Sequence, residues 1–327
     1  MARIDDVARQ AGVSSSTVSY VLSGKRSISK PTRDRVLQAV KDLGYRPHAG
    51  ARALASSRTN VIGLMLPLRP GVNVAVVMEF ASGVVTRARE LAHDVLIVTA
   101  DDPDAIGRAI GGSMVDSLIV MDVESNDPRI GVLSNSPVPV MLIGLPDDPG
   151  GLSCVDFDFE GAGRLAVARL AARGHTHLAL IGSPPSVYER GTSYARRLDR
   201  GYRAACADRG LEARVLQTTA SIAAGQEAIA ELLAAHPEIT GVVVHNEAAL
   251  PGVLMGRAGL ADPLDVVAIA PESIATGLGT RLDLIALPAQ AIGREAVDLV
   301  MAQSDEGAAA QTRLLSPQAR ALDPSAS

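Results

Sequence analysis

The chain begins with the stretch that decides its fold, Ile4-Asp5-Asp6-Val7-Ala8-Arg9-Gln10-Ala11-Gly12-Val13-Ser14-Ser15-Ser16-Thr17-Val18-Ser19-Tyr20-Val21-Leu22. Its first apolar residues recur at the spacing of one helix face, which predicts a short helix that ends at Gly12. Ser14 can cap a second helix by accepting a backbone N–H, and this helix would bury Val18. The stretch therefore predicts two short helices joined by a tight turn.

A third helix is expected to begin at Thr32, just after Pro31, and to stop at Gly44. Three short helices with a tight turn between the first two match the helix-turn-helix motif, whose second helix enters the major groove of DNA. The charge distribution agrees, because residues 1–58 contain 11 Lys and Arg against 4 Asp and Glu, a net charge of +7. The remaining residues hold 20 basic and 32 acidic side chains, a net charge of −12. Charge alone would also fit an ordinary solvated basic surface, but together with the motif it indicates a head that contacts a polyanion.

The quoted stretch resembles the DNA-binding headpiece of LacI/GalR-family transcriptional regulators, with an uninterrupted A-G-V-S-x-x-T-V-S-x-V-L core. The resemblance implies that the variable positions of this core, Ser15, Ser16 and Tyr20, read the edges of bases. It also implies that Thr17 and Ser19 contact phosphates. Phosphate contacts fix the register of a protein on DNA, whereas contacts with base edges carry the sequence information.

The following segment, Tyr45-Arg46-Pro47-His48-Ala49-Gly50-Ala51-Arg52-Ala53-Leu54, resembles the hinge of the same family. The resemblance implies a helix that forms in the minor groove, with Leu54 wedged between base steps and Arg52 near the DNA backbone. The alternative is a plain interdomain linker. That alternative draws support from His48, where the family prefers Asn, and from Gly50, which costs roughly 1 kcal/mol against Ala inside a helix.

Beyond residue 60, short apolar runs rich in β-branched residues alternate with stretches of helical periodicity. The runs are 61–66, 95–99, 117–121, 138–143, 178–181, 241–245 and 265–269. The helical stretches include 79–92, 162–173, 200–209 and 226–235. This alternation predicts an α/β fold in which parallel sheets carry helices on both faces.

The part of the chain beyond residue 58 is 269 residues long, which is more than one such core usually holds, so we expect two lobes. The family resemblance implies the same arrangement, a body like that of periplasmic sugar-binding proteins with the ligand in the cleft. We therefore expect a headpiece over residues 1–46, a hinge helix and linker over 47–60, and a two-lobed ligand-binding and dimerisation domain over 61–327.

In the cleft, the resemblance points to Asn246, Glu247 and Glu272 as ligand contacts. Arg196 and Arg197 are further candidates because they adjoin the position of a family arginine, and the alternative for these two is a solvated helix start. Asn246-Glu247 stands where the family has Asn-Asp, and Glu272 takes the first acidic position of its G-[FY]-D-D turn. Carboxylates and amides suit sugar hydroxyls because they accept and fix paired hydrogen bonds. A sugar or polyol is therefore the favoured effector, and an anionic metabolite would be possible if the arginines dominate.

Three other cleft positions depart from the family pattern. Leu198 replaces the arginine of the family's R-x-x-G-[FY] motif, Gly144 replaces an acid at the end of a strand, and Leu287 replaces a glutamine. Aromatic residues are also scarce, with no Trp, 3 Phe and 5 Tyr in the chain. The family's preference for sugars therefore does not carry over directly.

Several other classes of site find little support. The run Gly161-Ala162-Gly163-Arg164-Leu165-Ala166 fits a loose G-x-G-x-x-A dinucleotide pattern, but Glu160 would face the pyrophosphate. Neither a nucleophile elbow nor the spacing of a metal site is present, so we expect no enzyme activity, no cofactor and no metal. The two cysteines are too few for a disulfide framework, and no apolar run approaches the ~20 residues that span a bilayer.

Taken together, these features predict a cytoplasmic transcriptional regulator, expected to be a repressor, that binds a double-stranded DNA operator and responds to a small molecule. A homodimer on a palindromic operator is implied, because one helix reads only a few base pairs. The alternative is a stand-alone small-molecule-binding protein or enzyme with a vestigial DNA-binding head.

Overall fold

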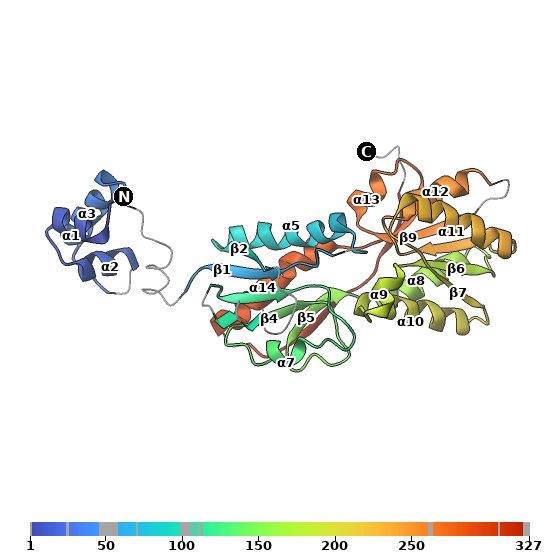
Figure 1. The fold of residues 1–327 in the computed structure, drawn as a ribbon, viewed down its shortest axis with the longest axis horizontal. Helices are drawn as coiled ribbons and strands as arrows, with labels where there is room; N and C mark the ends of the chain where they lie inside the picture. Colours follow the sequence, from blue (N-terminus) through green and yellow to red (C-terminus); the bar gives the residue numbers. More distant parts are fainter. Residues whose placement is uncertain are drawn as a thin grey trace.

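The computed structural model describes residues 2–23, 26–45, 58–69, 71–98, 106–107, 110–111, 114–260, 264–306 and 308–322. These residues form a three-helix headpiece and a body of two α/β lobes, as Figure 1 shows. The predicted fold class is confirmed. Within the described ranges, none of the helices is long and apolar enough to cross a membrane.

The headpiece consists of α1 (Ile4–Ala11), α2 (Ser15–Ser23) and α3 (Lys30–Asp42). The first helix ends as predicted at Gly12, whose φ of 65° lies in the left-handed region that glycine enters without steric cost. Val7, Val18 and Val36, one from each helix, are fully buried and form the centre of a small core. The third helix begins two residues earlier than predicted, because Pro31 lies inside its first turn.

Lobe 1 is built on a six-stranded sheet in the order β11-β5-β4-β3-β1-β2, and its paired strands are all parallel. Its strands are β1 (Val61–Met65), β2 (Asp94–Val98), β3 (Ser117–Val120), β4 (Val140–Ile143), β5 (Ser153–Phe157) and β11 (Thr312–Leu315). Its named helices are α5 (Val74–Glu90), α7 (Ile130–Leu133) and α14 (Ala289–Glu306). The end of the linker is tied to this lobe, since the Asp116 carboxylate accepts hydrogen bonds from the backbone N–H groups of Thr59 and Asn60.

Lobe 2 repeats the arrangement with the order β12-β10-β9-β8-β6-β7, in which only β12 runs antiparallel to its neighbour. Its strands are β6 (Leu178–Gly182), β7 (Ala213–Gln217), β8 (Gly241–Val244), β9 (Asp265–Ala270), β10 (Leu282–Ala286) and β12 (Ala319–Leu322). Its helices are α8 (Phe159–Ala171), α9 (Pro185–Glu189), α10 (Ser193–Ala207), α11 (Ile222–Ala235), α12 (Leu250–Ala258) and α13 (Glu272–Thr276).

The chain passes between the lobes three times, from β5 to α8, from β10 to α14 and from β11 to β12. Each lobe is therefore assembled from separate parts of the sequence, and the carboxyl ends of both parallel sheets come near the crossing strands. Ligands of such sheets bind in the crevice outside the carboxyl ends of the strands. The topology thus places a candidate site between the two lobes.

Close approach of the helices in both lobes depends on glycine. A Cβ added at Gly83 of α5 would overlap the backbone of α14, and one at Gly163 of α8 would overlap the backbone of α10. The backbone N–H of Gly161 is bound by the side chain of Asp158, which caps α8. These contacts account for the glycines of the loose dinucleotide pattern by helix capping and helix packing.

Candidate functional site

The outer face of α2 is the first candidate site. Ser14 begins this helix as predicted, because its Oγ accepts a hydrogen bond from the backbone N–H of Thr17 at 3.2 Å. Val18 anchors the opposite side of the helix in the headpiece core, which leaves Ser16 and Tyr20 exposed. Ser15 is half-buried and donates a hydrogen bond to the Asp5 carboxylate at 2.6 Å. The face is therefore polar and uncharged at its centre, and α1 holds one edge of it.

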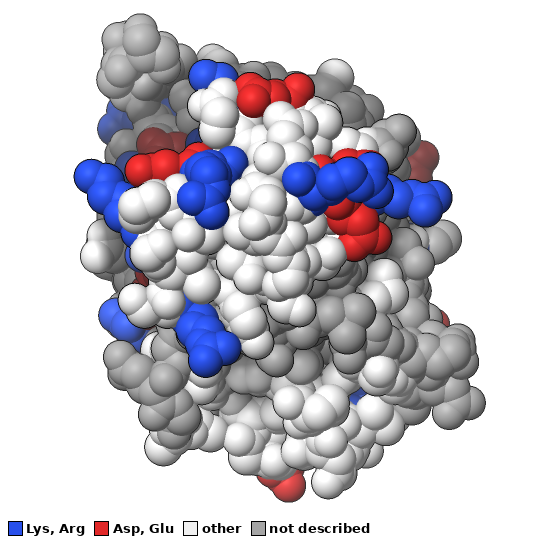
Figure 2. Space-filling view, turned by 90° about the vertical axis from the view of Figure 1, so that its left-hand side faces the viewer, with Lys and Arg blue, Asp and Glu red and all other residues white. Residues whose placement is uncertain are grey.

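Basic side chains are exposed on the surface of the headpiece. The exposed basic residues of the described headpiece are Arg3, Arg9, Arg26, Lys30, Arg33, Arg35 and Lys41. Figure 2 faces the end of the molecule that carries the headpiece, and it shows Lys and Arg spread around an uncharged area, with some Asp and Glu beside them. The Arg26 guanidinium lies 5.7 Å from the centre of the Tyr20 ring, within cation–π range. A headpiece surface that carries basic side chains beside an uncharged area suits DNA, whose phosphates flank its base edges.

The remaining predicted DNA contacts are placed only in part. Thr17 and Ser19 lie half-buried on α2, and the Thr17 hydroxyl is 2.9 Å from that of Ser14. Thr17 therefore also helps to hold the start of the helix. Arg52 and Leu54 of the hinge lie outside the described residues.

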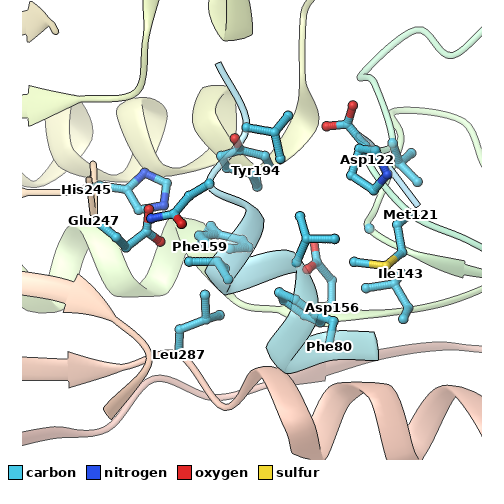
Figure 3. A pocket seen from close by; sticks show the side chains of 17 residues that line it. Phe80, Met121, Asp122, Ile143, Asp156, Phe159, Tyr194, His245, Glu247 and Leu287 are labelled. Atoms are coloured by element: carbon cyan, nitrogen blue, oxygen red, sulfur yellow. The ribbon is translucent and has the colours of Figure 1, made fainter. Parts of the chain in front are cut away.

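The second candidate site is a cavity between the lobes, with a volume of about 110 Å³. Its walls come from the carboxyl ends of strands in both sheets and from α5, α8 and α10, as Figure 3 shows. The lining is mostly apolar: Pro67, Val72, Val76, Val77, Phe80, Met121, Val123, Ile143, Gly144, Phe159 and Leu287. The polar lining residues are Asn73, Asp122, Asp156, Tyr194, His245 and Glu247. Gly144 and Leu287 stand where the family pattern has an acid and a glutamine. The cavity lining is therefore more apolar than that pattern would give.

An aromatic wall closes one side of the cavity. The ring of Phe159 lies 5.6 Å from that of Tyr194 and 5.5 Å from that of His245, and the last two rings are 5.6 Å apart. Three of the eight Phe and Tyr residues of the chain, Phe80, Phe159 and Tyr194, line the cavity. The few aromatic side chains are thus concentrated where a ligand could stack on them.

Two ion pairs join the lobes at the cavity wall. Asp156 of β5 in lobe 1 lies 2.6 Å from Arg197 of α10 in lobe 2, and both side chains are buried. Asp122 follows β3 of lobe 1 and pairs with Arg69 of its own lobe at 2.7 Å and with Arg190 of lobe 2 at 3.2 Å. Burial raises the pKa of Asp156 to about 6, although Arg197 opposes that increase. The charges of both carboxylates are therefore balanced by arginines. Arg197 and Arg190 come from lobe 2, and Arg69 comes from the same lobe as Asp122.

Glu247 and His245 have no such partner. Within the described part of the chain, no other residue forms an ion pair or hydrogen bond with the Glu247 carboxylate. Burial raises its pKa to about 7, although a hydrogen bond from its own backbone N–H opposes that increase. His245 is only 3% exposed, its Nδ1 has no hydrogen-bond partner, and burial lowers its pKa to about 4. The imidazole is therefore neutral near pH 7 and does not balance the charge of Glu247.

Of the five ligand contacts expected from the sequence, the structure brings only Glu247 into the cavity lining. Asn246 is buried, and its side chain donates to the backbone carbonyls of Gly182 and Thr218, so it fixes the ends of β6 and β7. Arg197 acts on the cavity through Asp156. Arg196 is exposed and lies outside the lining.

Glu272 also lies outside the lining, at the start of α13, where its exposed carboxylate pairs with Arg320. Sequence reasoning missed Asp122 and Asp156, although the acid that follows the apolar run 117–121 was a usable signal for Asp122. In the described part of the chain, no group of three or more His, Cys, Asp or Glu could hold a metal ion.

Known proteins resemble the chain over both parts. Residues 3–48 match the family described as bacterial regulatory proteins, lacI family, and residues 167–321 match the periplasmic binding protein-like domain. The chain is 32% identical to the HTH-type transcriptional regulator RafR of Escherichia coli, over 76% of this chain and 74% of that protein. It is 29% identical to catabolite control protein A of Priestia megaterium, over 91% of each chain.

Solved structures of similar fold include the lac repressor dimer bound to operator and the anti-inducer ONPF, with a TM-score of 0.82, 23% identity and 99% of each chain covered. A complex of the transcriptional regulator CelR with cellobiose matches with a TM-score of 0.65, 24% identity and 98% of each chain covered. The chain belongs to the lacI family of bacterial regulatory proteins and is a DNA-binding transcriptional regulator.

Proposed function

We propose that this regulator represses transcription by binding a palindromic operator through paired headpieces, and that a small molecule in the inter-lobe cavity changes its affinity for that operator. In this proposal Ser15, Ser16 and Tyr20 read base edges, and Thr17, Ser19 and Arg52 contact the DNA backbone. Leu54 is the wedge of the hinge. The headpiece would comprise residues 1–46, the hinge and linker 47–60, and the body 61–327.

The observation that carries the proposal is that the cavity is lined by residues that also form contacts between the two lobes. Arg197 and Arg190 of lobe 2 reach carboxylates of lobe 1 that line the cavity. Beside them, the backbone N–H of Ser125 donates to the carbonyl of Gly191 at 2.8 Å. An occupant that touches Asp122 or Asp156 would therefore alter the contacts that set the angle between the lobes.

A change in this angle can reach the DNA because the chain leaves lobe 1 toward the headpiece. Thr59 and Asn60 are bound to Asp116 of that lobe, so movement of lobe 1 carries the start of the linker with it. In a dimer, such movement would change the separation of the two headpieces. Effector and operator affinities are then coupled reciprocally, typically by about 1–3 kcal/mol.

The proposed homodimer would form through one apolar side of the body. Val74, Met78 and Val85 are about half exposed at helical spacing along α5, and Ile97 of β2 is exposed as well. In lobe 2, Ile222 at the start of α11 and Met255 of α12 are also exposed. Figure 1 shows α5, α11 and α12 on the same upper side of the two lobes. Apolar side chains exposed along both lobes favour a symmetric contact with a second copy.

A sugar or polyol remains the effector class favoured by the sequence, and it is supported by the CelR complex with cellobiose among proteins of the same fold. Its carbon–hydrogen faces could pack on Phe159 and Tyr194, and its hydroxyls could donate to the polar lining groups. We place the protein in the cytoplasm, where its operator would be.

A gel-shift experiment with the full-length protein and fragments of its own genome tests the proposal. We expect a small set of fragments to be retained at physiological salt, and these should share a palindromic site. Equal retention of all fragments, with affinity that vanishes as salt rises, would instead indicate non-specific contact with phosphates. Release or tightening of the retained fragment by a cavity ligand would support the regulatory half of the proposal.

A further inference from the structure

The charges inside the cavity do not balance. Three carboxylates line it, and two of them, Asp122 and Asp156, are paired with arginines. Glu247 has no such partner among the described residues, and none of the seventeen lining residues is Lys or Arg. An occupant of the cavity therefore faces one uncompensated acidic group.

The neighbours of Glu247 are hydrogen-bond acceptors and aromatic rings. Figure 3 shows His245 and Glu247 together on one side of the cavity, with Phe159 and Tyr194 nearby. His245 is 97% buried, and its unpartnered Nδ1 can accept a hydrogen bond when the ring carries its proton on Nε2. Burial keeps this imidazole neutral, because its pKa is lowered to about 4. The cavity thus combines a carboxylate, a second acceptor and the faces of aromatic rings.

We propose that the effector is a small organic cation whose protonated amine pairs with Glu247 beside the aromatic wall formed by Phe159, Tyr194 and His245. This inference rests on the proposed function, because it names the ligand class of the same site. The body of the ligand, whether sugar-like or hydrocarbon, packs against the apolar lining between Phe80 and Leu287.

The physical reason is that an ammonium group gains from the Glu247 carboxylate, from the acceptor nitrogen of His245 and from the faces of the aromatic rings. It forms a charge-assisted hydrogen bond with a carboxylate, which is roughly twice as strong as a neutral one. It is also attracted to the faces of aromatic rings, more strongly when both are removed from water. A neutral hydroxyl in the same place gains less, and an anion is repelled by Glu247 because no basic side chain lines the cavity.

The experiment uses the full-length protein and two pairs of probes that differ mainly in an amine against a hydroxyl group. Glucosamine is compared with glucose, and 2-phenylethylamine with 2-phenylethanol, by calorimetry and by the shift in melting temperature. We expect the amine of at least one pair to bind roughly ten- to hundredfold more tightly than its hydroxyl partner. The pair that responds distinguishes a sugar-like body from a hydrocarbon body.

Substitutions then assign the preference to Glu247. Glu247→Gln should lower the affinity of the amine to that of the hydroxyl compound, whereas Glu247→Asp, which keeps the charge, should retain a preference for the amine. Glu212→Gln is the matched control, because Glu212 is 70% exposed and precedes β7, at the end of the sheet remote from the cavity. It should bind all four probes like the unchanged protein.

Equal or tighter binding of the hydroxyl compounds would overturn the inference, as would the absence of binding by both amines at millimolar concentration. An amine preference that persists in Glu247→Gln would overturn it as well. These results would leave sequence-specific DNA binding untouched, and that binding is tested by the gel shift. Loss of operator preference, in contrast, would overturn the proposed function even if the cavity prefers amines.

Discussion

The Arg197 guanidinium of α10 lies 2.6 Å from the Asp156 carboxylate of β5, and this buried pair bridges lobe 2 and lobe 1 at the wall of the cavity. Arg197 also donates to the backbone carbonyl of Phe157 at 3.1 Å, on the segment where the chain crosses between the lobes. A charge pair in this position is costly to break, because either partner left alone would be a buried charge without compensation.

Replacing Arg197 by Met should therefore destabilise the protein. We expect the free energy of unfolding to fall by about 3–5 kcal/mol, measured by urea denaturation followed by circular dichroism. The double variant Asp156→Asn, Arg197→Met should recover most of this loss, since it removes the orphaned carboxylate. Arg196→Met is the control, because the exposed neighbour should change stability by no more than about 0.5 kcal/mol. A single variant as stable as the unchanged protein would contradict a structural role for the pair.

Glu247 should leave a signature in the dependence of stability on pH. Burial raises its pKa from 4.5 to about 7, so between these pH values the folded protein binds a proton that the unfolded chain has released. This contribution to stability is present below pH 4.5 and is lost as the pH rises to about 7. The other titratable or charged groups at the cavity are His245, Tyr194, Asp122 and Asp156. His245 contributes with the opposite sign, because burial lowers its pKa from 6.5 to about 4.

The prediction therefore concerns the difference between the unchanged protein and Glu247→Gln. Burial raises the pKa of Tyr194, so its phenol stays protonated in this range, and the contributions of the other groups cancel to first order in the difference. Melting temperatures should show the unchanged protein losing stability relative to the variant from pH 4.5 to 7, with a constant offset above that. A difference that does not change with pH would mean that Glu247 is ionised in the folded protein throughout this range.

Local sequence patterns predicted the elements whose apolar residues form a clear run or a helical repeat within one short segment. All seven apolar runs became strands, and the headpiece helices were found within a few residues of their expected ends. The strands that were not predicted contain polar or charged residues that interrupt the apolar run. The partners of some of these residues lie in distant parts of the sequence. Asp283 of β10, for example, is buried but pairs with Arg169 and Arg173, more than a hundred residues earlier in the chain.

Contacts between residues that are far apart in the sequence also limit what the sequence could predict about the cavity. Glu247 was expected from the resemblance to the family's Asn-Asp pair after a strand, and it does line the cavity. Asp156 lies in a strand that was not predicted, and its role depends on Arg197 of the other lobe. Asn246 and Glu272 matched family positions by sequence, and Arg196 was chosen because it lies near the position of a family arginine. The contacts of these three residues, with Thr218, with Arg320 and with solvent, are set by tertiary packing.

Tyr20 should influence which operator the protein prefers. Its side chain is 37% exposed on the outer face of α2, beside Arg26. Tyr20→Ala should change the discrimination at one position of the half-site by about 1–3 kcal/mol, measured by gel shifts on a set of singly substituted operators. Ser19→Ala, which would remove a phosphate contact, should weaken binding to all of these operators alike. If Tyr20→Ala also weakens every sequence equally, Tyr20 contacts the backbone and does not read bases.

Met78 tests the proposed dimer face. Its side chain is 48% exposed on α5, on the same face as Val74 and Val85, so a charge at this position would be buried without a partner in the dimer. Met78→Asp should therefore yield monomers in analytical ultracentrifugation. Its affinity for a full palindromic operator should fall by roughly a hundredfold or more, because each headpiece then binds its half-site alone.

The matched control for Met78 is Leu314→Asp, which places the same charge on another exposed apolar residue of lobe 1. Leu314 lies on β11, the edge strand of the sheet farthest from β2, and outside the proposed face. This variant should remain dimeric and bind the operator normally. Monomers produced by Leu314→Asp and not by Met78→Asp would move the interface to the β11 edge of the lobe. Dimers in both variants would place it on lobe 2, where Ile222 and Met255 are the exposed apolar residues to substitute next.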